Sequence, residues 1–295
     1  MKRPFIPIPP PAPLPEGETI DAASLLSAWK GLHPDDAGLS SEAPVTGPRW
    51  DLLCVMGPTA SGKTRYAVAL ARELNALLPP GRHCEIISAD SRQVYRRMDI
   101  GTGKDRGEYG EIPVHLLDIA EPGTEYNVYA YQQDFARVFG DIVARGCLPI
   151  LCGGSGLYVE AVTKRYDFGK GETSQISDGL PKSGKGRLLP EQTFYIGTLV
   201  SREERRARIA RRLDERLAGG MCEEIRGLLD EGVPARTLIR YGLEYKFVTQ
   251  YVLGEITYEE MRERLYIAIC QFAKRQMTWL RGMEKDGIRI HWTMV

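Results

Sequence analysis

The sequence lacks several features that would assign the protein to a specialised class. It has no net charge, because 39 Lys and Arg residues balance 39 Asp and Glu residues, so the overall charge does not indicate a polyanionic partner. None of the six cysteines forms a C-x-x-C pair, and no Cys/His cluster has zinc-site spacing. No apolar stretch approaches the ~18 residues that span a bilayer. We therefore expect a cytoplasmic protein with reduced cysteines, no membrane contact and a monomeric state.

What the sequence does contain is ordinary for a globular protein. Hydrophobic residues make up 43% of the 295 residues and charged residues 26%, which is enough apolar surface for a full core. Prolines crowd residues 4–15, and prolines after Met1 also interrupt the apolar run that a signal peptide would need. We divide the chain into four parts: a proline-rich extension and linker (1–48), a P-loop core (49–164), a flexible loop (165–190), and remaining core strands with C-terminal helices (191–295).

Apolar runs and helical patterns alternate along the core. We predict strands at 51–56, 84–88, 114–119, 148–152, 193–200 and 288–292. Helices are predicted at 20–32, 63–78, 128–145, from residue 155, and at 202–231, 241–253 and 257–283. Strands that alternate with helices of this length form a parallel sheet covered on both faces. The fold class is therefore α/β, with a P-loop NTPase-like sheet flanked by helices and a helical C-terminal part.

The strongest motif fits G-x-x-x-x-G-K-[ST], with a predicted strand before it and a helix after it. Such a loop turns backbone N–H groups toward an anion at a helix N-terminus, and its lysine adds a point charge. The hydroxyl of the last residue can bind Mg²⁺. A chance glycine-rich turn is the alternative, but the strand–loop–helix context argues against it. The phosphate-binding residues are Gly57, Pro58, Thr59, Ala60, Ser61, Gly62, Lys63 and Thr64.

The acid that nucleotide hydrolases and kinases place after a later strand to hold Mg²⁺ is missing here, because the run 148–152 leads into Gly153-Gly154. An acid instead follows the run 84–88: Asp90 lies just beyond the end of a predicted strand. Ligands bind at this edge of open α/β sheets, where a carboxylate can accept a proton. The alternative for Asp90 is the N-cap of a helix.

Basic residues gather in two later stretches. The first, from Arg202 to Arg212, also carries acidic residues and fits a salt-bridged surface helix equally well. The second runs from Lys274 to Arg281 and mixes cations with Trp279. RNA-binding surfaces combine phosphate contacts and base stacking in this way, although an amphipathic helix with Trp279 in the core is the alternative.

Five motifs occur in one order: the P-loop, ISADSRQVYRRMDIGTGK, PVHLLDI with YNVYAYQQDF, LPILCGGSGLY, and FAKRQMTWLR. Together they resemble the tRNA dimethylallyltransferase (isopentenyltransferase) family over about residues 50–164 and 193–292. The pair ISADS-x-Q-V-Y and AKRQ-x-T-W-x-R after a P-loop is highly specific. The resemblance implies transfer of a dimethylallyl group from dimethylallyl diphosphate to N6 of adenosine 37, next to the anticodon of tRNA, with release of diphosphate.

The resemblance also implies roles for individual residues. Asp90 matches the general base, Thr64 contacts Mg²⁺ and the leaving diphosphate, and Arg212 stabilises the diphosphate. These three are the expected catalytic residues, and Mg²⁺ held by Thr64 is the expected cofactor. The general chemistry agrees, because an adenine amine is a poor nucleophile that needs a base and the leaving group needs cations.

Residues near the tRNA anticodon arm are implied in the same way. Ser155 is expected beside the channel where adenine meets the donor, and the stretch 240–246 matches a turn that contacts tRNA. The expected tRNA-binding residues are Asp90, Ser91, Gln93, Tyr95, Ser155, Arg240, Tyr241, Gly242, Lys246, Lys274, Arg275, Gln276, Trp279 and Arg281. Members of the family usually carry a helical insertion with an Arg-x-x-Arg-Ala-x-Glu stretch, which residues 165–190 replace here.

Two other functions remain open from the sequence. A P-loop kinase of a small metabolite would share the fold class and bind ATP. A relative that only binds RNA would need no base beside its P-loop, so the presence of Asp90, Thr64 and Arg212 favours an enzyme.

Overall fold

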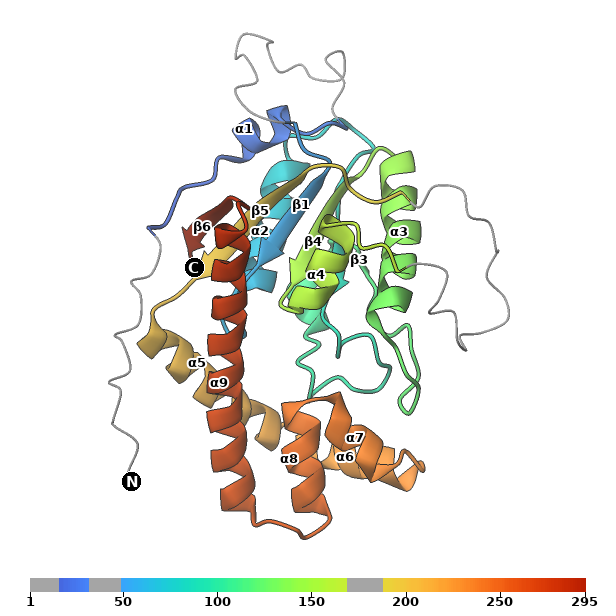
Figure 1. Cartoon of the computed structure of the whole chain (residues 1–295), viewed down its shortest axis with the longest axis vertical. Coiled ribbons are helices and arrows are strands. Elements are labelled where there is room, and N and C mark those ends of the chain that lie inside the picture. Colours follow the sequence, from blue (N-terminus) through green and yellow to red (C-terminus); the bar gives the residue numbers. More distant parts are fainter. Residues whose placement is uncertain (1–15, 32–48, 169–187) are drawn as a thin grey trace, which may run out of the picture.

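The computed structural model describes residues 16–31, 49–168 and 188–295, and it contains one six-stranded parallel sheet (Figure 1). The strand order is β3-β2-β4-β1-β5-β6. The strands are β1 (Leu52–Met56), β2 (Cys84–Ala89), β3 (Val114–His115), β4 (Leu148–Gly153), β5 (Thr193–Leu199) and β6 (Ile290–Met294). The predicted parallel α/β fold is confirmed.

Helices cover both faces of this sheet. On one face lie α1 (Ala22–Ser27) and α2 (Lys63–Asn75), and on the other lie α3 (Val128–Ala144), α4 (Gly156–Thr163) and the end of α9 (Tyr258–Lys285). A short 3-10 helix spans Arg106–Tyr109. The remaining helices are α5 (Arg202–Ala218), α6 (Met221–Asp230), α7 (Ala235–Tyr241) and α8 (Leu243–Val252). They form a helical part beyond the ends of the strands (Figure 1).

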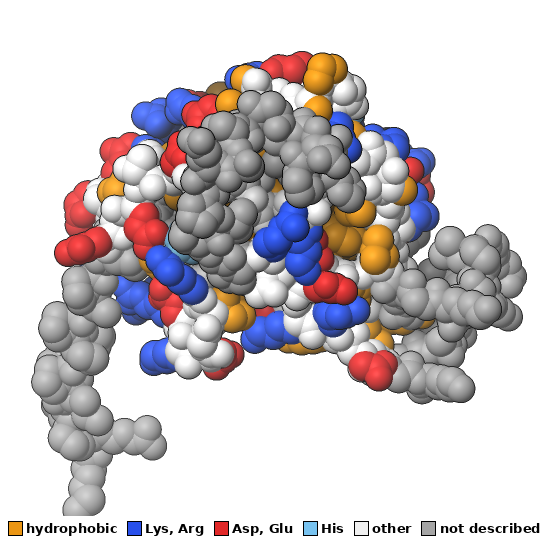
Figure 2. Space-filling view, turned by 90° about the horizontal axis from the view of Figure 1, so that it is seen from above, with side chains coloured by type: hydrophobic (Ala, Val, Ile, Leu, Met, Phe, Trp, Pro, Cys, Tyr) orange, Lys and Arg blue, Asp and Glu red, His pale blue; other side chains and the backbone are white. Residues whose placement is uncertain are grey.

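Charges of both signs lie side by side on the surface at the other end of the sheet, where the strands begin. Figure 2 views the molecule from this end and shows Lys and Arg side chains next to Asp and Glu. This mixture agrees with a net charge of zero and favours solubility over attraction to a polyanion at this end.

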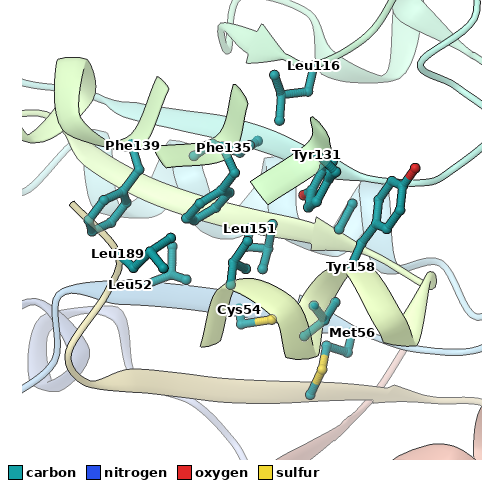
Figure 3. Close-up of a cluster of buried hydrophobic side chains, with 14 of the residues drawn as sticks. Leu52, Cys54, Met56, Leu116, Tyr131, Phe135, Phe139, Leu151, Tyr158 and Leu189 are labelled. Carbon is teal, nitrogen blue, oxygen red and sulfur yellow. The ribbon is translucent and has the colours of Figure 1, made fainter. Parts of the chain in front are cut away.

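The alternation of side chains along β1 divides the core into two layers. Leu52, Cys54 and Met56 point into the cluster under α3 and α4, where Phe135 and Tyr158 also lie (Figure 3). The residues between them, Leu53 and Val55, face α2. Since both faces are covered, β1 is buried along its whole length, which explains why it is apolar at every position rather than at every second one.

The helical part has its own core, and one of its predicted helices is divided into two. The predicted helix 202–231 is interrupted at Gly219 and Gly220, and Gly220 has a left-handed φ of 99°. Our prediction of one continuous helix over 202–231 was wrong because these glycines allow the sharp turn that lets α5 and α6 pack around shared apolar residues. The predicted helix 241–253 corresponds to α8, whereas α7, which ends just before Gly242, was not predicted.

The ordered core begins earlier in the sequence than Asp51. Leu25, Leu26 and Trp29 are buried with residues of α2, and the backbone of Trp29 bridges to Trp50. Residues 20–31 therefore form part of the core rather than of a linker. Residues 1–15, 32–48 and 169–187, which include most of the predicted extension and loop, lie outside the described residues.

Two further expectations concern single features. The third predicted strand, 114–119, ends at His115 because Leu116 and Asp118 adopt positive φ angles of 64° and 54° and turn the chain. All six cysteines lie in described segments, and none forms a disulfide. In the described segments, no helix combines the length and the apolar character that crossing a membrane requires.

Candidate active site

The ends of three strands bring the predicted site residues together. Met56 of β1 and Ala89 of β2 both pair with Gly153 of β4, so these strands finish at the same level. The P-loop, Asp90 and the Gly154-Ser155 turn follow directly. Parallel strands thus place three segments that are far apart in the sequence at one edge of the sheet, where ligands bind in open α/β folds.

The P-loop conformation depends on small residues. Gly62 precedes α2 with a left-handed φ of 80°, which favours glycine. At Gly57 a β-carbon would lie only 2.2 Å from Thr198 Oγ1 and 2.4 Å from Ser61 Oγ. The two hydroxyls are themselves 2.7 Å apart and buried. The loop is therefore built against β5, and its N-terminal glycine has no room for a side chain.

Gln276 of α9 fixes the P-loop from the other side. Its Oε1 accepts a hydrogen bond from the Thr59 N–H at 2.8 Å, and its Nε2 donates to the Gly154 carbonyl at 2.9 Å. The side chain is buried. We expected Gln276 to contact tRNA, but both ends of its amide are used within the protein, so we reassign it to positioning the P-loop.

Lys63 and Thr64 begin α2 at the centre of the site. Burial lowers the pKa of Lys63, and the nearby Arg212 adds to this effect while Asp90 opposes it. In the described part of the chain, the Lys63 amine makes no hydrogen bond or ion pair within the protein. Burial raises the pKa of the neighbouring Cys152 to about 11, although Lys63 and the Thr64 hydroxyl counteract the rise.

Asp90 lies in a turn rather than at a helix N-cap. Its Oδ1 accepts a hydrogen bond from the Arg92 N–H at 2.9 Å, and the residues that follow form turns. Ser155 supports the same turn, because its hydroxyl accepts the Ser91 N–H at 2.9 Å. Among the described residues, no partner occupies the second carboxylate oxygen of Asp90, so this oxygen can accept a proton from a ligand.

Three arginines of α5, spaced four residues apart, lie along this site. Arg208 lies beside the P-loop, 3.6 Å from where a Gly62 β-carbon would stand, and it contacts Glu204 at 2.8 Å. Arg212 lines a crevice of about 330 Å³ with the loop 99–105. Burial lowers the pKa of Arg212, and the adjacent Arg216 lowers it further. The sequence pointed to Arg212 but missed Arg216, although its i,i+4 spacing was visible.

The loop 99–105 is held by buried and half-buried polar side chains. Gln93 donates through Nε2 to the carbonyls of Gly103 and Thr102 at 3.2 and 3.4 Å. Glu224 of α6 accepts the N–H groups of residues 99, 100 and 101 at 2.8, 2.7 and 3.1 Å. Gln93, an expected tRNA contact, thus has a structural role. Glu224 was missed because its partners are backbone groups, which no side-chain pattern reveals.

Two tyrosines that we expected at the tRNA surface are buried. The rings of Tyr95 and Tyr241 pack at a centroid distance of 4.3 Å. The Tyr241 hydroxyl accepts the Gly123 N–H at 2.6 Å and donates to the Thr124 carbonyl at 3.0 Å. Our tRNA-binding prediction for these residues is corrected, since they connect the sheet part with the helical part.

The other expected tRNA residues vary in exposure. Trp279 is partly buried and packs on Gly156, where a β-carbon would lie 2.5 Å from the indole. This agrees with the core alternative for Trp279. Gly242 and Arg281 are half-buried, whereas the exposed cations are Arg240, Lys246, Lys274 and Arg275.

Comparison with known proteins identifies the family. The model of the IPP transferase family matches residues 93–185 and 170–283. The tRNA dimethylallyltransferase 1 of Parabacteroides distasonis is 44% identical over 290 residues, covering 82% of this chain and 92% of that protein. The tRNA dimethylallyltransferase 2 of Shewanella sediminis is 45% identical over 289 residues, covering 82% and 93%.

Solved structures agree with this result. A tRNA isopentenylpyrophosphate transferase from Bacillus halodurans superposes with a TM-score of 0.67 at 29% identity, over 83% of this chain and 89% of its own. The Staphylococcus epidermidis tRNA delta(2)-isopentenylpyrophosphate transferase gives a TM-score of 0.66 at 28% identity, over 82% and 92%. With its P-loop, the adjacent carboxylate and these matches, the chain belongs to the IPP transferase family.

Proposed function

We propose that the protein transfers a dimethylallyl group from dimethylallyl diphosphate to N6 of adenosine 37 in tRNA. The observation that carries this proposal is the position of Asp90 at the same sheet edge as the P-loop, with one carboxylate oxygen open to a ligand. A site for a diphosphate next to a base is what attack by a weak amine nucleophile requires. The names of the relatives point to the same reaction.

In this proposal the acidic and the basic residues have different catalytic roles. Asp90 removes the proton from the N6 amine as the new C–N bond forms at the allylic carbon and the C–O bond to diphosphate breaks. Lys63 and Arg212, with the backbone N–H groups of the P-loop, stabilise the negative charge that develops on the diphosphate. Ser155 keeps the turn of Asp90 in position through the Ser91 N–H.

Magnesium fits the donor chemistry of this site. Mg²⁺ prefers oxygen ligands and keeps several waters, so one protein hydroxyl together with diphosphate oxygens is a suitable set. Thr64, in the first turn of α2, supplies that hydroxyl. When bound, the ion would neutralise part of the charge on the leaving diphosphate.

The tRNA anticodon arm would lie against the exposed cations Arg240, Lys246, Lys274 and Arg275. All four are solvent-exposed on α7, α8 and α9. Phosphate contacts by exposed Lys and Arg residues position nucleic acids without reading sequence.

The length of the relatives supports the further proposal that this chain lacks a segment near residues 165–190. The alignment with the Parabacteroides protein spans 290 positions but covers 82% of this chain, about 242 of its 295 residues. About 48 positions of the alignment therefore have no counterpart here. The family model also matches as two segments, 93–185 and 170–283, which overlap at residues 170–185.

Mass spectrometry of tRNA nucleosides after incubation with enzyme, dimethylallyl diphosphate and Mg²⁺ tests the proposed reaction. We expect a prenylated adenosine that disappears without donor. Unmodified tRNA, combined with binding of ATP that is tighter than binding of dimethylallyl diphosphate, would favour a kinase. Unmodified tRNA that still binds tightly would favour a binding protein.

A further inference from the structure

We propose that Arg216 forms, together with Arg212, a phosphate-binding pair in the crevice between α5 and the loop 99–105. The proposal rests on the function proposed above for the identity of the substrates. Neither the resemblance nor the P-loop pattern assigns a role to Arg216. The argument comes from the crevice, from the partners of the two guanidinium groups and from Gly103.

The two arginines face one crevice. Arg212 and Arg216 both line the space of about 330 Å³ that also borders Gly103. They are four residues apart on α5, which places them one turn apart on the same side of the helix. Like charges at this spacing repel each other, so an anion between them would relieve the repulsion.

Neither guanidinium is saturated within the protein. In the described segments, Arg212 makes no hydrogen bond and no ion pair, although it is half-buried. Arg216 has one ion pair, with Glu244 at 3.6 Å, and both side chains are about four-fifths buried, at 21% and 23% exposure. Each guanidinium has five N–H donors, and half-buried donors without partners are unfavourable. A phosphate group is a ligand that can accept several of these N–H groups at once.

The backbone around Arg216 is shaped to hold its side chain in place. Gly103 has a φ of 64°, and a β-carbon at this position would lie 1.7 Å from Arg216 Nη2. The guanidinium therefore lies directly on the loop backbone, in a space that any larger residue would fill. Glu244, at the start of α8, contacts the same guanidinium. An arginine fixed by a glycine surface and a carboxylate loses less side-chain entropy when it binds an anion.

Acidic residues also line the crevice, and Asp105 and Glu215 act electrostatically on Arg212 without forming an ion pair with it in the described segments. Asp99 contacts the buried Lys104 at 2.7 Å, and Glu215 points toward Arg211 at 3.9 Å. Asp105 is exposed at the rim. Because ionised carboxylates only accept hydrogen bonds, the guanidinium groups of Arg212 and Arg216 are the groups of this pair and its acidic neighbours that offer N–H donors to an entering phosphate.

Two phosphates of the proposed reaction have this chemistry: the diphosphate of the donor and the backbone phosphates of tRNA. Titration of pyrophosphate, and separately of tRNA, into the wild type and Arg216→Gln distinguishes these sources. Loss of one charge-assisted contact should weaken binding on the order of 10- to 100-fold. A loss for pyrophosphate assigns the pair to the donor, whereas a loss for tRNA alone assigns it to the RNA backbone, and either outcome supports the proposal.

Matched variants keep the result interpretable. Arg211→Gln removes an arginine from the exposed side of α5, where its side chain is 67% exposed, and should leave both affinities unchanged. Arg216→Lys keeps the charge but loses the planar guanidinium that can bind a phosphate through two N–H groups. Its affinity should lie between those of the wild type and Arg216→Gln. Gly103→Ala should displace the guanidinium and reproduce the loss.

Unchanged affinity for both ligands in a folded Arg216→Gln protein would overturn the proposal. Because the readout is binding, it also separates the two hypotheses. If the wild type produced no prenylated adenosine but bound pyrophosphate in an Arg216-dependent way, the proposed function would fail and the phosphate-binding pair would stand.

Discussion

Glu85 and Lys63 are both charged residues of the sheet region, and the protein surrounds them in opposite ways. Glu85 lies near the start of β2, where its buried carboxylate pairs with Arg145, with His115 at 2.6 Å and with His83 at 3.0 Å. Lys63 lies beyond the end of β1, where neither it nor Arg212 has a hydrogen-bonding partner among the described side chains. Among the described side chains, Glu85 at one end of the sheet has ion-pair partners, whereas Lys63 and Arg212 at the other end have none.

The difference separates stability from binding. A buried carboxylate paired with Arg145 and two histidines makes the fold depend on these partners, because removing Arg145 leaves an uncompensated buried charge. Cations without partners do not stabilise the fold, and they favour the entry of an anion. The pKa shifts follow the same division. Burial would raise the pKa of Glu85, but Arg145 and His115 lower it to about 2, whereas burial lowers the pKa of Lys63.

The largest expected effect comes from a change at the P-loop end of the sheet, which should leave the fold intact. Asp90→Asn should fold and bind donor normally but lose about 10²–10⁴ in kcat, which is the usual contribution of a general base. Single-turnover prenylation of tRNA and thermal unfolding of the same sample measure both quantities. Turnover close to that of the wild type would remove Asp90 from the mechanism.

The complementary change removes the charge of Glu85 at the other end of the sheet. Glu85→Gln should lower the free energy of unfolding by about 2–3 kcal/mol at neutral pH and leave donor affinity unchanged. Urea unfolding of the variant measures this loss. Glu191→Gln is the matched control, because its partner Lys30 lies at the surface and the Glu191 side chain is 71% exposed; its change should be much smaller.

The pH dependence of folding stability tests the contribution of Glu85 independently. The pKa of Glu85 is about 2 in the folded protein, below its ordinary value of 4.5. Its contribution to stability is therefore present above pH 4.5 and is lost as the pH falls toward 2. The stability difference between wild type and Glu85→Gln should shrink over this range, and a difference that stays constant would contradict our view of this network.

A third change removes a cation from the phosphate site. Lys63→Ala should weaken the binding of pyrophosphate on the order of 10- to 100-fold without altering which tRNA is modified. Isothermal titration and competition between tRNAs measure the two effects. Arg212→Ala should behave in the same way, and if it changed only tRNA affinity, Arg208 would become the better candidate for the diphosphate contact.

The smallest expected effect concerns the tRNA surface. If this chain lacks a segment that its relatives have, fewer cations contact the RNA and fewer counterions are released. tRNA affinity should then be weaker, and should fall less steeply with salt, than for a longer relative such as the Parabacteroides protein. Donor affinity should be similar in both proteins. Equal affinities and slopes across a salt series would refute this proposal.

Sequence patterns predicted the sheet, the P-loop and the edge at which Asp90 lies, because each depends on local features. Apolar runs such as 148–152 mark strands buried on both faces, and Gly62 and Lys63 define a phosphate loop by their own conformations and charges. The helix break at Gly219 was also visible in principle. We missed it because an amphipathic pattern continues across a turn when both helices face one core.

The sequence by itself determined the parallel α/β fold, the phosphate loop and the membership in a tRNA-modifying family. Only the tertiary structure decided which polar residues are used internally. Gln276, Tyr95 and Tyr241 belong to motifs that suggested an RNA surface, yet the fold turns them inward. Likewise, Arg208 and Arg216 share the spacing of Arg212, but what each meets depends on the P-loop and on Gly103. The physical reason is that the partner of a polar side chain comes from distant segments of the chain, and spacing within one helix fixes only the direction in which the side chain points.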